Sequence, residues 1–231
     1  MLGVGSDFRP GTLLRAYRSG IFPWPHSISR ESREPNDNAP ASRDAAERGV
    51  AEPPLVLWFS PSVRAIFPLE APMRWSRSLR RTLRSHPYEI TLDEDFVRVM
   101  RMCGDTRPKG TWIIPELIEG YAKLHAFGWA HSVEIWEKGH GSRVLVGGIY
   151  GVSVGCAFAG ESMFHTRTDT SKIAFATLAE ALRRAGYILF DVQVLTSHLA
   201  SLGCIEVPRT DYLARLENSL LRTPKPLSIF G

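Results

Sequence analysis

The sequence has few cysteines and no long apolar run. Its three cysteines, Cys103, Cys156 and Cys204, are scattered and follow no zinc or CxxC spacing. This pattern indicates reduced thiols that serve as small apolar side chains. No stretch of about 18 apolar residues occurs, so we expect no membrane-spanning helix. The first residues show no basic start followed by an apolar segment, so we expect no signal peptide and a cytoplasmic protein.

Several sequence motifs of known chemistry are also missing. The seven histidines form neither an HExxH motif nor a Cys/His ligand spacing, so no metal site is predicted. The GxSxG nucleophile motif and the phosphate-binding P-loop are absent. The run GGIYGVSVG lies in predicted strands and not in a strand-to-helix turn, so it gives little support to a nucleotide site.

The chain has 231 residues, which suffice for one large domain or two small ones with a hydrophobic core. Its net charge of +4 is modest, but six arginines and a single acid, Glu70, occupy residues 64–84. One interpretation of this segment is the solvated face of a helix. The other is a surface that contacts a phosphate backbone, because guanidinium groups match phosphate oxygens in a planar, bidentate geometry.

Periodicity, capping residues and turn residues predict the secondary structure. Residues 27–54 hold four prolines and few apolar side chains, which indicates a mobile loop. Strands that pair in sequence, then a helix and a further strand, predict α/β or α+β layers. The expected strands are 55–61, 88–92, 130–137, 143–162 and 187–194. The expected helices are 7–19, the arginine segment, 93–102 capped by Asp93, 115–127, 170–184, 196–203 and one from Thr210.

Asp191 lies in the middle of the predicted strand ILFDVQV. Because alternate residues of a strand share a face, Leu189, Asp191 and Gln193 point one way, and Phe190 and its apolar alternates form the core face. A carboxylate and an amide would then lie about 7 Å apart along the opposite face. The alternatives are an exposed aspartate without a function and an aspartate in a buried ion pair.

Glu161 precedes a polar loop and the helix predicted at 170–184. This corner lacks the glycine turn with which helix N-termini bind phosphate. Glu161 could instead be a structural partner of Arg167 or Lys172. Strict alternation places Phe158 and Glu161 on opposite faces, so a pocket that they share would need a bulge or a strand end near position 160.

Ordered motifs along the chain resemble one enzyme family. The motifs are GIFPW (20–24), WFSP (58–61), GTWI (110–113), AHSVE (130–134), VGGIYGV (146–152), GESMF (160–164), SK (171–172), DVQVLTSHLASLG (191–203), EVPR (206–209) and Tyr212. Their order and spacing resemble those of leucyl/phenylalanyl-tRNA–protein transferases. The resemblance runs from about residue 3 to about residue 216, without the 27–54 loop.

The resemblance implies an α+β protein with a small N-terminal α/β domain, residues 1–66, and a larger GNAT-like (acetyltransferase-fold) domain, residues 67–231. It implies transfer of Leu or Phe, and in some members Met, from aminoacyl-tRNA to the N-terminal Arg or Lys of a protein, which marks that protein for degradation. It also implies a monomer that needs no metal, acetyl-CoA or other cofactor.

The resemblance also implies roles for particular residues. Asp191 and Gln193 match the catalytic pair, with Asp191 as base or electrostatic organiser, and Glu161 matches an acid that holds the cationic acceptor. The aminoacyl pocket matches at Phe59, Trp112 and Phe158, whereas Leu178 and Leu182 stand where better-known members carry phenylalanines. The basic cluster for the tRNA acceptor stem matches at Arg77, Arg80, Arg81 and Arg84.

The expected chemistry agrees with this assignment. An aminoacyl ester is already activated, and the α-amine that attacks it has a pKa of about 7.7–8.0, so a group must accept its proton. Two rival functions stay open from the sequence. One is an acetyl-CoA-dependent acetyltransferase of the same fold, which would need a glycine-rich pyrophosphate turn. The other is an RNA-binding adaptor without catalytic activity.

Overall fold

The computed structural model of the chain describes residues 2–5, 7–24, 56–70, 77–85, 88–106, 113–139 and 141–229. The mobile loop predicted at 27–54 lies outside these ranges. The strands are β1 (Gly3–Gly5), β2 (Phe22–Trp24), β3 (Val56–Phe59), β4 (Val63–Phe67), β5 (Glu89–Leu92), β6 (Ala130–Lys138), β7 (Arg143–Val154), β8 (Ala157–His165), β9 (Leu189–Gln193) and β10 (Ile205–Pro208). The helices are α1 (Pro10–Arg18), α2 (Arg77–Ser85), α3 (Phe96–Asp105), α4 (Pro115–Ala126), α5 (Thr170–Ala185), α6 (Ser197–Ser201) and α7 (Arg209–Leu220).

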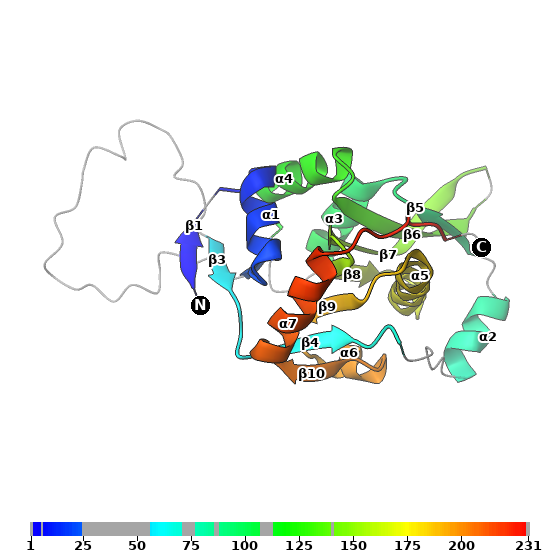
Figure 1. Cartoon of the computed structure of the whole chain (residues 1–231). Helices are drawn as coiled ribbons and strands as arrows, with labels where there is room; N and C mark the ends of the chain where they lie inside the picture. The colour runs from blue at the N-terminus through cyan, green and yellow to red at the C-terminus, as the bar shows by residue number, and fades with distance from the viewer. Residues whose placement is uncertain are drawn as a thin grey trace, which may run out of the picture.

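The described strands form two sheets. A small sheet has the order β1–β3–β2, and a large one has the order β10–β4–β9–β8–β7–β6–β5. Helix α5 packs on one face of the large sheet, while α1, α3, α4 and α7 pack on the other (Figure 1). Each face has its own hydrophobic core. The predicted α+β class is therefore confirmed, with a sheet that is mostly antiparallel.

Local sequence signals explain most of these elements. Pro115 begins α4, where its missing N–H costs nothing, and Gly186 ends α5 with a φ of +86°. The cap predicted for α3 is wrong by two residues. Asp95 accepts the N–H of Arg98, whereas Asp93 turns its side chain toward β6.

The start of the arginine segment is not helical, and this corrects the sequence-based expectation. Residues 63–67, VRAIF, form β4, because an apolar and β-branched run packs well between two neighbouring strands. The helix is confined to Arg77–Ser85. The predicted strand region 143–162 is also divided, by a turn at Gly155 and Cys156, into the antiparallel pair β7 and β8.

The centre of the large sheet holds the one parallel pair among its described strands. β8 and β9 pair from Ala157 and Leu189 as far as Ala159 and Asp191, and beyond that point they diverge. The register of β7 and β8 shifts so that Glu161 is an extra, bulged residue. No helix in the described ranges is long and apolar enough to cross a membrane.

Candidate functional site

Glu161, Gln193 and Asp191 come together where β8 and β9 diverge. The Gln193 side-chain amide donates a hydrogen bond of 2.7 Å to Oε1 of Glu161. The Gln193 backbone N–H donates one of 2.8 Å to Oδ1 of Asp191. One residue thus connects two carboxyl groups from neighbouring strands. Whether Glu161 and Asp191 meet was open from the sequence, and the fold brings them to one site.

Two backbone irregularities produce this meeting. The first is the bulge at Glu161. It lies near position 160, where alternation along the sequence predicted a bulge or a strand end if Phe158 and Glu161 were to share a pocket. Gln193 has a φ of +66°, and across it the Val194 N–H donates to the Val192 carbonyl at 2.8 Å. Such a three-residue turn with positive φ is rare and strained, and strain of this kind is concentrated at functional sites.

Asp191 forms a buried, bidentate ion pair with Arg64. Arg64 Nε donates to Oδ1 at 2.8 Å and a terminal nitrogen donates to Oδ2 at 2.6 Å. The Tyr212 hydroxyl donates to Oδ2 at 2.9 Å. The buried ion pair that the sequence left open is therefore present. The expectation of a single apolar face is wrong, because Asp191 is only 2% exposed and both faces of β9 are covered.

Arg64 was not predicted as a site residue. Its guanidinium lies 4.3 Å from the ring centre of Phe22 and 4.5 Å from that of Tyr212, and it also donates to the Gly20 carbonyl at 3.1 Å. Only 1% of Arg64 is exposed, so it belongs to the core and not to the surface formed by the arginines of α2. The sequence signal for a buried ion pair was the arginine inside the apolar run VRAIF, because a buried arginine requires an acidic or hydrogen-bonding partner.

Glu161 lies beside two buried tyrosines, Tyr17 and Tyr121. The Tyr121 hydroxyl donates to Oε2 of Glu161 at 3.3 Å, and Tyr121 and Tyr17 share a short hydrogen bond. Burial raises the pKa of Glu161 to about 8; a hydrogen bond from Tyr17 opposes this rise and the Asp191 charge adds to it. This pKa places the exchange of the Glu161 proton in the neutral to slightly alkaline range.

The two tyrosines are further residues that the sequence did not single out. Tyr17 lies on α1 and Tyr121 on α4, and burial raises the pKa of both hydroxyls well above the ordinary value for tyrosine. The structural partners considered for Glu161 are excluded. Arg167 pairs with Glu137 and Lys172 pairs with Asp169.

Three of the residues expected at the aminoacyl pocket lie together. Phe158, Leu178 and Leu182 are buried in the core between the sheet and α5. Phe59 is half-buried and packs against the other core, and Trp112 lies outside the described residues. The sheet thus separates this apolar group from Glu161, whose tyrosine partners belong to the other core.

Three arginines of α2 have exposed side chains. Arg77, Arg80 and Arg81 are exposed, whereas Leu79 is buried against the body of the protein. The side chain of Arg84 is outside what the structure describes. Thr82 donates to Asp169 at 3.1 Å, which attaches α2 to the N-terminal end of α5. An exposed basic face of this kind fits both interpretations of the segment, a solvated helix and a phosphate contact.

Comparisons with known proteins point in one direction. The family model described as leucyl/phenylalanyl-tRNA protein transferase matches residues 66–217, and the model of that family's N-terminal domain matches residues 6–31. Proteins named leucyl/phenylalanyl-tRNA–protein transferase are similar over nearly the whole chain. That of Solidesulfovibrio magneticus is 43% identical over 94% of this chain and 77% of its own length. That of Dechloromonas aromatica is 43% identical over 100% and 87%.

Proposed function

The chain belongs to the leucyl/phenylalanyl-tRNA protein transferase family, and from this premise we propose that it transfers a leucyl or phenylalanyl group from tRNA to a protein. The proposed acceptor is the α-amine of an N-terminal Arg or Lys, and the modified protein is marked for degradation. Met is a further proposed donor residue. The observation that carries the proposal is the bridge made by Gln193 between Glu161 and Asp191.

The proposed reaction forms an amide without an external energy source. The acceptor nitrogen attacks the ester carbonyl carbon, a C–N bond forms, and the ester C–O bond to the ribose breaks. Of the three ammonium hydrogens, one stays on the amide, one ends on the ribose oxygen and one is released. Glu161 takes the released proton when it is in its ionised form, since its pKa of about 8 is close to that of an α-amine, about 7.7–8.0.

Asp191 serves as an electrostatic organiser in this proposal. Its two oxygens already accept hydrogen bonds from Arg64, Tyr212 and the Gln193 backbone, so they are poorly placed to take a proton from substrate. Asp191 stabilises the three-residue turn at Gln193 by accepting the Gln193 backbone N–H. The Gln193 amide in turn orients Glu161 and polarises the reacting carbonyl.

The remaining contacts are proposed from the family resemblance. Phe158, Leu178 and Leu182 are the proposed apolar contacts of the transferred side chain on the α5 side. Phe59 and Trp112 are further proposed contacts. The exposed arginines of α2 contact the phosphates of the acceptor stem. We further propose a monomer in the cytoplasm, with a small N-terminal domain over 1–66 and a GNAT-like domain over 67–231. The pair of parallel strands that diverge beside α5 supports the second assignment.

A transfer assay with two acceptor peptides tests the proposal. Purified protein is given tRNA charged with radiolabelled leucine and a peptide that begins with Arg or with Ala. We expect label on the Arg peptide and none on the Ala peptide, because the ionised form of Glu161 can bind the cationic side chain of the acceptor. Equal labelling of both peptides would disprove the acceptor assignment. If the charged tRNA binds and neither peptide is labelled, the protein is a binding adaptor and not a transferase.

A further inference from the structure

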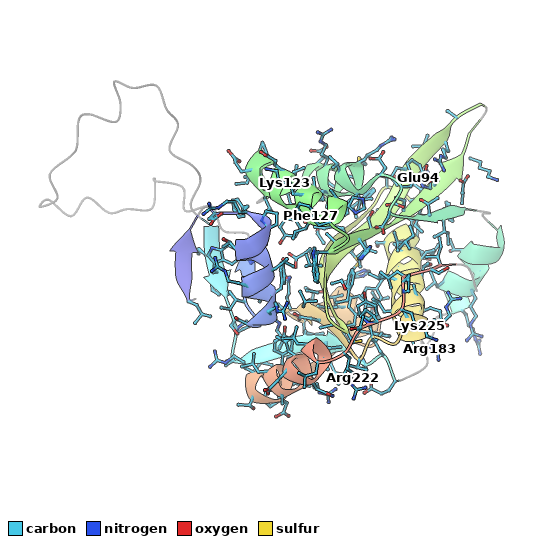
Figure 2. The ribbon with its side chains drawn as sticks, turned by 45° about the horizontal axis from the view of Figure 1, so that its top comes forward. Glu94, Lys123, Phe127, Arg183, Arg222 and Lys225 are labelled. Atoms are coloured by element: carbon cyan, nitrogen blue, oxygen red, sulfur yellow. The ribbon has the colours of Figure 1, made fainter. Side chains whose placement is uncertain are left out.

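A groove of about 610 Å³ opens on the side of the sheet where β7 turns into β8. Three segments form its walls: the turn from α4 to β6 (127–129), the turn after β7, and the chain that follows α7 (220–227). Figure 2 shows Phe127, Arg222 and Lys225 around the face turned toward the viewer. Gly155 lines the groove, and β8 begins two residues later at Ala157. Glu161 lies four residues further along β8, which is about 13 Å along a strand, so the groove is separate from the carboxyl site.

The walls of this groove are fixed by backbone hydrogen bonds. The Ser153 N–H donates to the Trp129 carbonyl at 2.7 Å, and the Lys225 N–H donates to the Ala185 carbonyl at 2.9 Å. Gly155 has a φ of +55°, and a Cβ atom at this position would lie 2.5 Å from the Ser219 carbonyl oxygen. Such close packing between the turn and α7 keeps the groove open without a ligand, which lowers the entropic cost of binding.

The groove combines exposed aromatic rings with cations. Phe127 is 69% exposed and Trp129 is 36% exposed, although large aromatic side chains are usually buried. Arg18, Arg222 and Lys225 are exposed, and none forms an ion pair with an acid in the part of the chain that the structure describes. By contrast, exposed Lys123 and Arg183 pair with Glu119 and Glu180.

The acid that lines the groove, Asp93, offsets only part of the charge of the three cations. Asp93 directs one oxygen to the His131 ring at 2.7 Å and the other to the Ser132 N–H at 2.8 Å. Its carboxylate is therefore engaged with β6. What the groove offers a ligand is positive charge beside flat apolar rings, which is the combination that binds an unpaired nucleotide through its phosphate and its base.

We propose that this groove is a second RNA contact, which holds unpaired nucleotides of the tRNA substrate at a distance from the aminoacyl end. The phosphates lie against Arg222, Lys225 and Arg18, and a base stacks on Phe127 or Trp129. This inference rests on the proposed function for the identity of the RNA. An acidic peptide would use the cations but would leave the two rings without a role, so RNA is the occupant that the observations favour.

Fluorescence anisotropy with a fluorescein-labelled ten-nucleotide oligouridylate, and with uncharged tRNA, tests the contact directly. We expect Phe127→Ala to weaken binding about tenfold, the size of one lost stacking contact. The double variant Arg222→Ala, Lys225→Ala should weaken binding and reduce the slope of log K against log salt by about one to two units. The matched control Lys123→Ala, Arg183→Ala removes the same charge from paired positions and should change affinity less than twofold.

A second donor separates the groove from the carboxyl site. Leucyl-adenosine carries the ester but no further nucleotides, so the groove variants should use it at the wild-type rate and lose only transfer from full tRNA. Unchanged RNA affinity in these variants, or an equal loss with both donors, overturns the inference. Displacement of the RNA by a polyglutamate peptide at equal affinity also overturns it. If wild-type protein transfers leucine from neither donor, the proposed function is disproved. The anisotropy measurement does not depend on transfer, so it still tests whether the groove binds RNA.

Discussion

Arg64 and Asp191 show which facts about single residues a sequence hides. Alternation along the strand predicted that Asp191 and Gln193 lie on one side. The ion-pair partner of Asp191 is Arg64, which is 127 residues away in sequence on β4, the strand that pairs with β9. No local pattern reports such a contact. Removing one partner of a buried ion pair typically costs about 3–5 kcal/mol, so this pair constrains the fold as well as the site.

Glu161 makes a pH-dependent contribution to stability that can be measured. The pKa of Glu161 is raised from 4.5 to about 8 in the folded protein. Between these values the unfolded chain releases the proton and the folded chain keeps it, so stability falls as pH rises. Relative to the variant Glu161→Gln, the wild type should lose up to about 1.4 kcal/mol of unfolding free energy per pH unit in this window.

Urea unfolding of both proteins at pH 5, 6, 7 and 8 measures this difference. Taking the difference cancels other groups that titrate in the same range, among them Glu134, whose burial raises its pKa to about 7. A constant difference between wild type and Glu161→Gln across the series would show that Glu161 is ionised in the folded protein. Its pKa would then lie far below that of the α-amine, and Glu161 would be too weak a base for the proton transfer proposed for it.

At the scale of elements, local signals predicted the helices better than the strands. α4 and α5 begin or end at Pro115 and Gly186, whose backbone preferences act within one turn. β4 was assigned to a helix because its arginine was grouped with the basic residues that follow it. Its position between β9 and β10 depends on partners distant in sequence, and this tertiary context overrides local composition.

The basic face of α2 can be tested as a unit. Replacing Arg80 and Arg81 by Ala should weaken tRNA binding and lower the salt slope of log K by about one to two units, since each phosphate contact releases counterions. The same double replacement at Arg98 and Arg101 of α3 removes equal charge from another helix and should leave the slope unchanged. If the α2 variant also keeps the wild-type slope, its arginines form a solvated face and nothing more.

At the scale of the whole molecule, the strand order creates the site. β4, β9 and β8 are adjacent in the sheet although they are far apart or reversed in sequence, and the parallel pair at the centre diverges just where Glu161 and Gln193 lie. The sequence predicted the α+β class and the carboxyl residues. It did not predict the sheet order, the tyrosines around Glu161 or the groove beside α7, because all three depend on long-range contacts.

The most direct test of the account is single-turnover leucine transfer by the variant Gln193→Ala, measured together with its affinity for tRNA. Gln193 is half-buried, and its replacement by Ala removes the side-chain donor to Glu161 while the backbone N–H that donates to Asp191 stays. The account predicts that transfer to an Arg peptide falls about 100-fold or more, the usual loss when a positioned polar group is removed, while tRNA affinity changes less than twofold. Transfer at the wild-type rate would contradict the account, because the bridge between Glu161 and Asp191 would then have no part in the chemistry.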